Sequence, residues 1–284
     1  MLTFDEQLGI LIDAALREDI GDGDHSTLSS ISADARGKAV LKVKQEGLLA
    51  GIDVAQKIFH RQEPSARFTA FKKDGDSMQP GETAFEVEAS VYTILQCERL
   101  VLNCMQRMSG IATLTRQYTQ RLQGYTTRLL DTRKTTPNFR LLEKEAVRIG
   151  GGINHRMGLY DMIMLKDNHI DYCGGLEPAI LRAWAYVQNN RPGLKIEVET
   201  RSLDEVKKVL DIGKVDRILL DNFTPAQLKE ALQLIGGRVE TEASGGIHLD
   251  NLEAYAATGV DYISIGALIH QAKSLDLSLK AVIM

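Results

Sequence analysis

The stretch IEVETRSLDEVKKVLDIGKVDRILLD, residues 196–221, contains one strand–helix–strand unit. Its two apolar runs each end on an acid, Glu199 after the first and Asp221 after the second. Between them, Ser202 and Glu205 have the spacing of a capping box, which predicts the start of a helix. Because both runs are almost continuously apolar and a helix separates them, they predict adjacent strands of a buried parallel sheet.

The same alternation extends in both directions, over residues 126–266. Apolar strand candidates that end near a polar, charged or glycine residue lie at 129–130, 162–165, 196–198, 218–220, 239 and 262–265, and a short seventh strand is expected at 154–157. Polar residues at successive strand ends favour a barrel, because a barrel brings all its strand ends to one mouth. We expect an α/β barrel of seven strands, one fewer than the usual eight.

The residue pattern is different over residues 37–90, where short β-like runs are separated by residues that favour turns. The clearest runs lie at 39–43, 68–71 and 84–89. Helical patterns precede and follow this region, at 4–16 and at 91–122. These features predict an α/β sandwich domain.

The junction between the two domains is expected near Ser109 and Gly110, which interrupt the pattern of the long helix. The expected domains are therefore an N-terminal α/β sandwich over 1–112 and a catalytic α/β barrel over 113–269. The remaining segment, about 270–284, is expected to pack back on the N-terminal domain.

The chain has 34 lysines and arginines against 38 aspartates and glutamates, a formal net charge of −4. This balance argues against a general nucleic-acid or anionic-membrane binder, so any anion site must be local. No apolar run approaches the ~20 residues of a membrane span, and the acids Asp5, Glu6 and Asp13 do not fit a signal peptide. The cysteines, an odd number without metal-ligand spacing, favour packing roles in a reducing cytoplasm; they are Cys97, Cys104 and Cys173.

The stretch DTRKTTPNFR, residues 131–140, is a basic loop between the first expected barrel strand and a helix. It belongs to a larger set of cations near strand ends, which comprises Arg133, Lys134, Arg140, His155, Arg156 and Lys166. Arginine suits planar carboxylates because two parallel N–H donors match two oxygens. Cations packed in one mouth repel one another unless anions bind there. The alternative is that each cation pairs with a nearby acid, such as Asp131, Glu143 or Asp161, and it weakens as the number of cations grows.

Two acids, Glu199 and Asp221, end neighbouring strands and are expected at the same mouth. Such carboxylates can hold Mg²⁺, which prefers oxygen ligands and usually bridges to substrate phosphates. The alternative is that both acids form ion pairs with the cations. Glu197 shares a side of its strand with Glu199 but lies one layer deeper, so we expect it to pair internally.

Glycine-rich turns end the last two expected strands, and they are Ser244-Gly245-Gly246 and Gly266-Ala267. In barrels, these loops commonly bind phosphate through backbone N–H groups and a helix N-terminus. His270, one turn past Gly266, either adds a donor or lies on a helix surface. Cations that bind the carboxylates of a substrate, acids that bind magnesium and a phosphate site together suggest phosphoribosyl transfer to a small planar acid.

These residues belong to longer segments that together resemble the quinolinate phosphoribosyltransferase family, also called nicotinate-nucleotide pyrophosphorylase (carboxylating), over essentially the whole chain. The matching segments, in order, are ERLVLN at 98–103, SGIAT at 109–113, DTRKTTP at 131–137, GGINHR at 151–156, LKDNH at 165–169, EVE at 197–199, LDNF at 220–223 and EASGGI at 242–247. Jointly and in this order, they are highly specific. One departure is Asn138, where the family commonly has glycine; asparagine tolerates a left-handed backbone better than most residues.

The resemblance implies a sandwich N-terminal domain, an open seven-stranded α/β barrel and a homodimer whose active site includes Arg99 from the partner subunit. It implies an enzyme that joins quinolinate to phosphoribosyl pyrophosphate with decarboxylation. The products would be nicotinate mononucleotide, pyrophosphate and CO₂, in de novo NAD biosynthesis. Whether dimers assemble further into hexamers stays open.

The resemblance also assigns roles to individual residues. Those that would grip the carboxylates of quinolinate are Arg133, His155, Arg156 and Lys166. Lys134 would neutralise the phosphoribosyl donor, and Glu199 and Asp221 would hold Mg²⁺ around it. Those that would bind the 5-phosphate are Ser244, Gly245, Gly246, Gly266 and His270. The catalytic set is then Lys134, Lys166, Glu199 and Asp221.

Alternatives to this function remain. The nearest is a paralogue of the same fold that is associated with molybdenum transport, and another is a nicotinate-type transferase that does not decarboxylate. A Schiff-base aldolase barrel would use Lys166 as its nucleophile, and a non-catalytic protein would only bind a small anion. The products formed from quinolinate, phosphoribosyl pyrophosphate and Mg²⁺ distinguish most of these alternatives.

Overall fold

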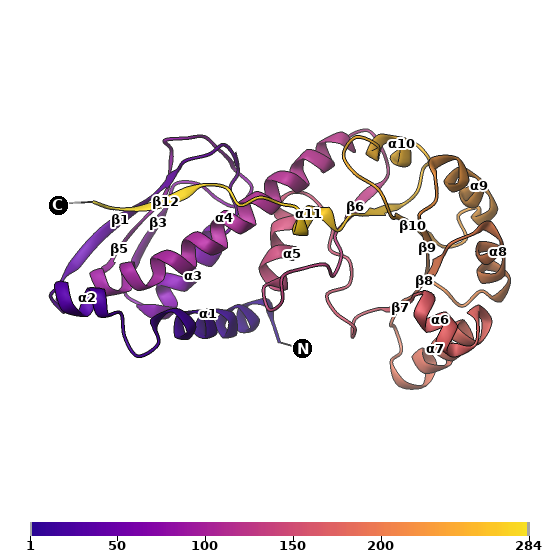
Figure 1. Ribbon diagram of the computed structural model, residues 1–284, viewed down its shortest axis with the longest axis horizontal. Coiled ribbons are helices and arrows are strands. Elements are labelled where there is room, and N and C mark those ends of the chain that lie inside the picture. The colour runs from indigo at the N-terminus through magenta and orange to yellow at the C-terminus, as the bar shows by residue number, and fades with distance from the viewer. Residues whose placement is uncertain (1, 283–284) are drawn as a thin grey trace. The chain divides into compact units, whose positions relative to one another are not determined.

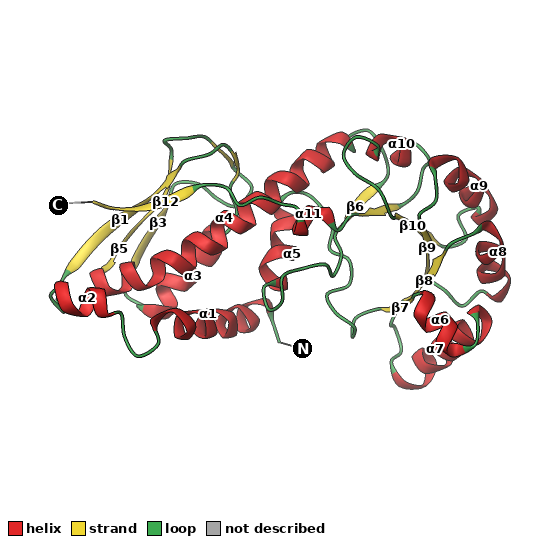
Figure 2. Cartoon of the chain, in the orientation of Figure 1, coloured by secondary structure: helices red, strands yellow, loops and turns green. Residues whose placement is uncertain are grey.

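The structure is a computed structural model that describes residues 2–282. The chain forms two compact units, each assembled from separate segments (Figures 1 and 2). The first unit comprises residues up to 116, residues 135–151 and residues from 268; the second comprises residues 117–134 and 152–267. The basic loop of residues 131–140 therefore begins in the second unit and ends in the first.

The first unit contains a four-stranded antiparallel sheet in the order β12–β1–β5–β3, and a separate pair, β2–β4. The strands are β1 (Arg36–Val43), β2 (Gly47–Leu48), β3 (Arg67–Ala70), β4 (Ser77–Met78), β5 (Thr83–Ser90) and β12 (Leu277–Val282). Leu41 of β1 lies opposite both Leu279 of β12 and Phe85 of β5, and all three side chains are buried. The last strand therefore completes the core of a sheet that forms near the start of the chain (Figure 1).

The helices of the first unit are α1 (Phe4–Ile20), α2 (His25–Ser30), α3 (Ile52–Gln62), most of α4 (Val91–Arg121), α5 (Arg140–Ile149) and most of α11 (Ala267–His270). A capping box at Thr3 and Glu6 begins α1, where both reciprocal hydrogen bonds form. Among residues 2–282, no helix is long and apolar enough to cross a membrane.

The long helix α4 runs without a break for 31 residues, so the expected interruption at Ser109 and Gly110 is wrong. Gly110 is required by packing instead, because a Cβ atom there would lie 2.0 Å from the carbonyl oxygen of Lys273. Next to it, the Ser109 hydroxyl accepts a hydrogen bond from the backbone N–H of Ala50 at 3.0 Å. The two small residues let other backbone segments approach the helix closely.

The second unit contains a six-stranded parallel sheet in the order β6–β11–β10–β9–β8–β7. The strands are β6 (Arg128–Leu130), β7 (Ile163–Leu165), β8 (Ile196–Thr200), β9 (Arg217–Asp221), β10 (Glu240–Ser244) and β11 (Tyr262–Ser264). The helices are α6 (Asp167–Cys173), α7 (Leu176–Asn190), α8 (Leu203–Ile212), α9 (Pro225–Ile235) and α10 (Leu252–Ala256). As the sequence predicts, Ser202 begins α8 by accepting the N–H of Glu205 at 3.2 Å.

The expected seventh strand at 154–157 is wrong, because within residues 2–282 the parallel sheet has six strands. Ile153 alone forms an isolated parallel bridge with Leu130 of β6. Two residues later, the N–H of His155 donates to the carboxylate of Asp131 at 2.8 Å. The pairing along β6 therefore stops because a side chain takes the donor that a further ladder bond would use.

Candidate active site

Charged residues at the C-terminal ends of β7, β8 and β9 meet a serine at the end of the neighbouring strand β10. Lys166 follows β7, and its ammonium lies 3.2 Å from Oε2 of Glu199 in β8. Asp221 is the last residue of β9 and pairs in register with Ser244, the last residue of β10. The parallel register thus brings a cation, two carboxylates and a hydroxyl to one edge of the sheet, as the sequence predicts.

The charge of Glu199 acts on the carboxyl group of Asp221. Burial, with the nearby charge of Glu199, raises the pKa of Asp221 above its usual value, and the ammonium of Lys166 offsets part of this rise. The side-chain amide of Asn222 also donates to Oδ2 of Asp221 at 2.6 Å. A divalent cation between the carboxylates would relieve their repulsion, and oxygen donors suit Mg²⁺, so these residues fit that ion.

A tight turn after β10 brings backbone close to this edge. Gly245 has a φ of 92°, and a Cβ atom there would lie 2.2 Å from the amide oxygen of Asn222. Asn222 itself has a φ of 57°, and its N–H donates to the carbonyl of Ser244 at 2.8 Å. Glycine is therefore required at 245 by a steric contact, whereas a Cβ atom at Gly246 would meet no atom within 4 Å and only its φ of 64° favours glycine. Asn222 is not among the predicted site residues, although an asparagine directly after a strand-ending acid favours a left-handed turn.

In the predicted cationic set, the charge of Arg133 acts on the guanidinium group of Arg156. Burial, with the positive charge of Arg133, lowers the pKa of Arg156. Arg156 also donates from Nη1 to the carbonyl of Met162 at 3.2 Å, which fixes its direction. Lys134 is exposed, and its backbone N–H donates to the hydroxyl of Thr132 at 3.1 Å. An anion beside Arg133 and Arg156 would relieve their repulsion.

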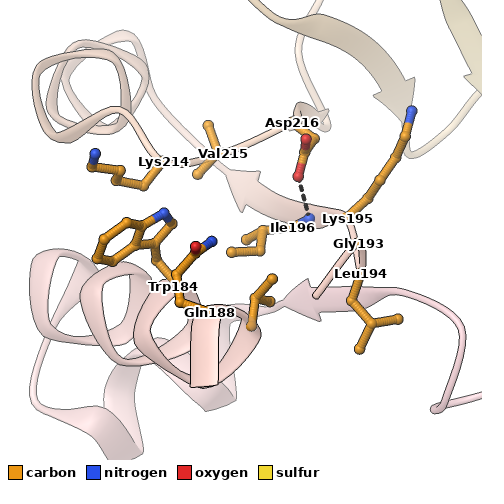
Figure 3. A pocket seen from close by; sticks show the side chains of 10 residues that line it. Trp184, Gln188, Gly193, Leu194, Lys195, Ile196, Lys214, Val215 and Asp216 are labelled. Carbon is orange, nitrogen blue, oxygen red and sulfur yellow. Dashed lines mark hydrogen bonds between the residues drawn. The ribbon is translucent and has the colours of Figure 1, made fainter. Parts of the chain in front are cut away.

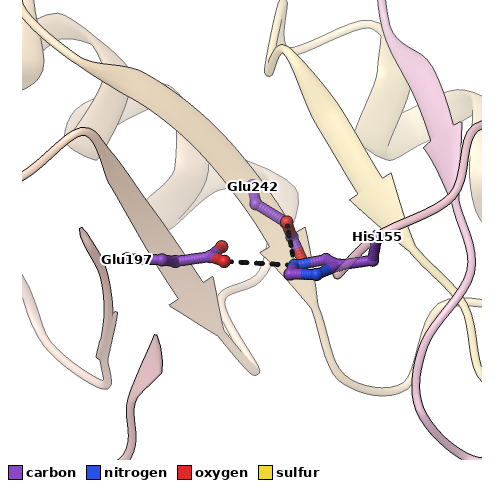
Figure 4. A group of neighbouring side chains, drawn as sticks. All are labelled: His155, Glu197 and Glu242. Carbon is purple, nitrogen blue, oxygen red and sulfur yellow. Dashed lines mark ion pairs between the residues drawn. The ribbon is translucent and has the colours of Figure 1, made fainter. Parts of the chain in front are cut away.

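His155 lies in the interior of the second unit rather than at its surface (Figure 4). Its Nε2 atom is 3.1 Å from Oε2 of Glu197 and 3.2 Å from Oε2 of Glu242. Its Nδ1 atom accepts the backbone N–H of Arg156 at 2.6 Å. Both ring nitrogens are thus engaged within the protein, and Glu197 pairs internally as expected.

Burial and close pairing shift the pKa values of His155, Glu197 and Glu242 from their usual ranges. Burial alone would lower the pKa of His155, but the pairs with Glu197 and Glu242 outweigh it and raise that pKa to about 9. Burial and the neighbouring Glu242 raise the pKa of Glu197 to about 7. For Glu242, burial is outweighed by the hydrogen bonds from His155 and Ser264, so its pKa is lowered.

The same three side chains do not favour a metal ion, although their ligand atoms lie within 4.8 Å of one another. Because Nδ1 of His155 accepts the N–H of Arg156, the ring proton lies on Nε2, the nitrogen that faces Glu197 and Glu242, and a protonated nitrogen cannot bind a metal. Nη1 of Arg217 also lies 3.1 Å from Oε2 of Glu242 and supplies positive charge. The geometry is that of a charge-compensated cluster.

The cluster shows how strongly the parallel sheet is curved. Glu197 is in β8, and His155 follows the bridge that Ile153 forms with β6. In a flat sheet with strands ~4.8 Å apart, β6 and β8 would be ~19 Å from each other, because three strands separate them. One imidazole could not then contact a side chain of β8, so the sheet bends around this cluster.

Three predicted residues belong to the first unit. Arg99 is exposed on α4, and His270 is exposed at the end of α11. Arg140 begins α5, and its Nε donates to the hydroxyl of Thr135 at 2.9 Å. Asn138, in the same loop, has a φ of 62°, which is the left-handed conformation expected for it.

A separate hollow of about 330 Å³ lies at the opposite ends of the strands, near the starts of β8 and β9 (Figure 3). Trp184 of α7 forms one wall, and the ammonium of Lys214 lies 4.6 Å from the centre of its ring. Asp216 accepts the backbone N–H of Ile196 at 2.7 Å. None of the predicted site residues lines this hollow.

The fold and the site define an α/β enzyme that handles anionic substrates, because its strand ends combine acids, cations and a glycine turn. Residues 24–109 match the N-terminal domain of quinolinate phosphoribosyl transferase, and residues 111–280 match its C-terminal domain. The chain belongs to the quinolinate phosphoribosyltransferase family.

Individual relatives agree with this assignment over most of their length. Quinolinate phosphoribosyltransferase [decarboxylating] 2b, mitochondrial, from Nicotiana tabacum is 43% identical over 94% of this chain and 80% of its own. The probable nicotinate-nucleotide pyrophosphorylase [carboxylating] of Bacillus subtilis is 41% identical over 96% of this chain and 93% of its own. The crystal structure of NadC from Streptococcus pyogenes is 41% identical and superposes with a TM-score of 0.90, covering 100% of this chain and 99% of that one.

Proposed function

We propose that this enzyme transfers the phosphoribosyl group of phosphoribosyl pyrophosphate to quinolinate and releases CO₂. The products are nicotinate mononucleotide and pyrophosphate, and the reaction supplies NAD biosynthesis in the cytoplasm. The observation that carries the proposal is the meeting of Lys166, Glu199 and Asp221 at neighbouring strand ends, in a chain of this family.

Quinolinate is a planar ring with two adjacent carboxylates, so it needs fixed cations. Burial, and after it the charge of Arg133, lowers the pKa of Arg156, and a bound dicarboxylate would offset both positive charges. Lys166 adds a third cation. His155 was expected in this grip, but its ring nitrogens are engaged by Glu197, Glu242 and the backbone. We therefore assign His155 to supporting Arg156 from within.

The phosphoribosyl donor carries a pyrophosphate and a 5-phosphate. Glu199 and Asp221 would hold Mg²⁺, which would neutralise pyrophosphate when bound. Lys134, which is exposed in the basic loop, would add positive charge to the same group. The backbone at Gly245 and Gly246, with Ser244, Gly266 and His270, would bind the 5-phosphate.

The chemistry needs little more than positioning and charge neutralisation. The ring nitrogen of quinolinate forms a bond to C1 of the ribose while the bond from C1 to pyrophosphate oxygen breaks. The alkylated ring is then an electron sink, so the carboxylate beside the nitrogen leaves as CO₂ and the ring carbon takes up a proton. Lys166 and the arginines would hold the acceptor nitrogen near C1. This positioning lowers the entropic part of the activation barrier. Cations near the leaving pyrophosphate stabilise its developing charge.

The active form in this proposal is a homodimer in which Arg99 completes the neighbouring site. Its support is that Arg99 is an exposed arginine on α4 within a segment matched by the family.

A comparison of acceptors tests the function. Purified protein with Mg²⁺ and phosphoribosyl pyrophosphate should form nicotinate mononucleotide from quinolinate and not from nicotinate. The reverse preference would assign the chain to a nicotinate-type transferase.

A further inference from the structure

Glu143 is a fully buried acid outside the proposed site, in the first turn of α5. Its carboxylate reaches back to the basic loop: the N–H of Thr136 donates to Oε2 at 2.7 Å, and the Thr136 hydroxyl donates to Oε1 at 2.9 Å. Nε of Arg107 donates to Oε1 at 2.9 Å. A buried carboxylate with this many charge-assisted bonds holds its partners in one arrangement.

Arg107 extends these bonds to a second segment. Its Nη1 donates to the carbonyl of Ala272 and its Nη2 donates to the carbonyl of Ile269, each at 2.7 Å. These two carbonyls flank His270, at the end of α11. The guanidinium of Arg107 thus binds Glu143 with one donor and the turn around His270 with two others, so it joins two other segments of the first unit to α4.

The segment after α11 is built to lie against α4. The N–H of Leu275 donates to the carbonyl of Gln106 at 3.1 Å, and the side-chain amide of Gln106 donates to the carbonyl of Leu277 at 3.0 Å. Gly110 allows the backbone at Lys273 to touch the helix. The carbonyls at 269 and 272 accept from Arg107, whereas the residues beyond this turn have the other bonds just described.

We propose that Arg107 and Glu143 are positioning residues that fix the loop following Lys134 and the turn containing His270. The proposal rests on the function proposed above, in which Lys134 and His270 bind the phosphoribosyl donor. Neither member of the pair touches a substrate. Glu143 acts through Thr136, two residues after Lys134, and Arg107 acts through the carbonyls on both sides of His270.

Hydrogen exchange of the substrate-free protein tests this pair directly. Glu143→Gln removes the charge, and it also presents an amide N–H₂ to groups that are all donors. Amide exchange should rise about tenfold or more in both 132–139 and 267–274, while β1 and β5 keep their protection. Thr136→Val removes only the hydroxyl bond and should raise exchange in 132–139 alone.

Glu145→Gln is the matched control, because Glu145 lies in the same helix but pairs with Arg148 at the surface. It should change exchange in neither segment. The pair has no positioning role if Glu143→Gln leaves 267–274 unchanged, or if it raises exchange equally throughout the first unit. Because no substrate is present, these outcomes stand even if quinolinate proves not to be the acceptor.

Steady-state kinetics separate positioning from a loss of folded protein. Thr136→Val should raise KM for phosphoribosyl pyrophosphate about fivefold and change KM for quinolinate less than about twofold. A purely structural role would lower kcat with both KM values unchanged. This variant also keeps the test open if Glu143→Gln does not fold.

Discussion

The ammonium of Lys166 lies 3.2 Å from the carboxylate of Glu199. In the proposed function, Lys166 binds the acceptor, quinolinate, and Glu199 binds the metal ion beside the donor, phosphoribosyl pyrophosphate. The contact therefore joins the acceptor site to the donor site. Lys166 remains 48% exposed, whereas Glu199 is only 11% exposed. The lysine can therefore bind a substrate carboxylate without losing its internal partner.

Replacement of Lys166 by alanine tests this double role. Lys166→Ala should lower kcat/KM for quinolinate by about 10–10²-fold, because a charge-assisted bond to the reacting acid is lost. Lys207→Ala, which removes a surface pair with Asp204, is the control and should retain full activity. A loss smaller than about tenfold would place Lys166 outside the chemistry.

Arg133 is predicted to bind a carboxylate of the acceptor rather than the sugar. Arg133→Ala should therefore raise KM for quinolinate much more than KM for phosphoribosyl pyrophosphate, by about tenfold or more in the ratio of the two. The measurement varies each substrate at saturating levels of the other. If the donor KM rises more, Arg133 belongs to the donor site and not to the acceptor site.

The cluster of His155 and Glu197 makes stability depend on pH. The pKa of His155 is raised to about 9, so its stabilising contribution is present below its usual pKa of 6.5 and is lost as pH rises towards 9. The pKa of Glu197 is raised to about 7, so the folded state also loses stability as pH rises from 4.5 to 7. Both effects have the same sign, because the folded cluster binds more protons than the unfolded chain.

Urea unfolding at several pH values between 5 and 9 measures this effect. The free energy of unfolding should fall with pH, by up to ~1.4 kcal/mol per pH unit for each retained proton. Glu197→Gln removes the acid and weakens the stabilisation of protonated His155. The free energy of unfolding of this variant should therefore depend less on pH than that of the wild type. Parallel curves for the two proteins would show that the cluster does not retain protons.

A shared active site predicts complementation between two inactive variants. Arg99→Ala and Lys166→Ala chains, unfolded and refolded together, should recover about a quarter of wild-type activity. Half of the randomly mixed dimers are then heterodimers, each with one intact site of two. Verified heterodimers without activity would argue against an arginine contributed across the dimer.

The sequence predicts most of the parallel sheet because its strands are short, continuous apolar runs between capped helices. It also predicts the acids at 199 and 221, since parallel register brings successive strand ends to one edge. It misjudges Gly110, because the reason for that glycine is a contact with Lys273, distant in sequence. A local pattern cannot distinguish a glycine that breaks a helix from one that admits another backbone.

His155 shows a similar limit within the site. Its neighbours in sequence are basic and polar, so pattern alone assigns it to the cationic set. Its partners, Glu197 and Glu242, come from strands that only the curvature of the sheet brings to it. The bonds of Arg107 to residues 269 and 272 are likewise absent from any local motif. Such residues are found only when distant segments are seen together.

The release of CO₂ is the most direct test of the central claim. Quinolinate labelled in the carboxylate beside the ring nitrogen, incubated with the purified protein, Mg²⁺ and phosphoribosyl pyrophosphate, should release labelled CO₂ in equal amount to nicotinate mononucleotide. Omitting phosphoribosyl pyrophosphate should abolish the release, because decarboxylation follows alkylation of the ring. Product from nicotinate but none from quinolinate, or labelled CO₂ without the sugar donor, would contradict the account.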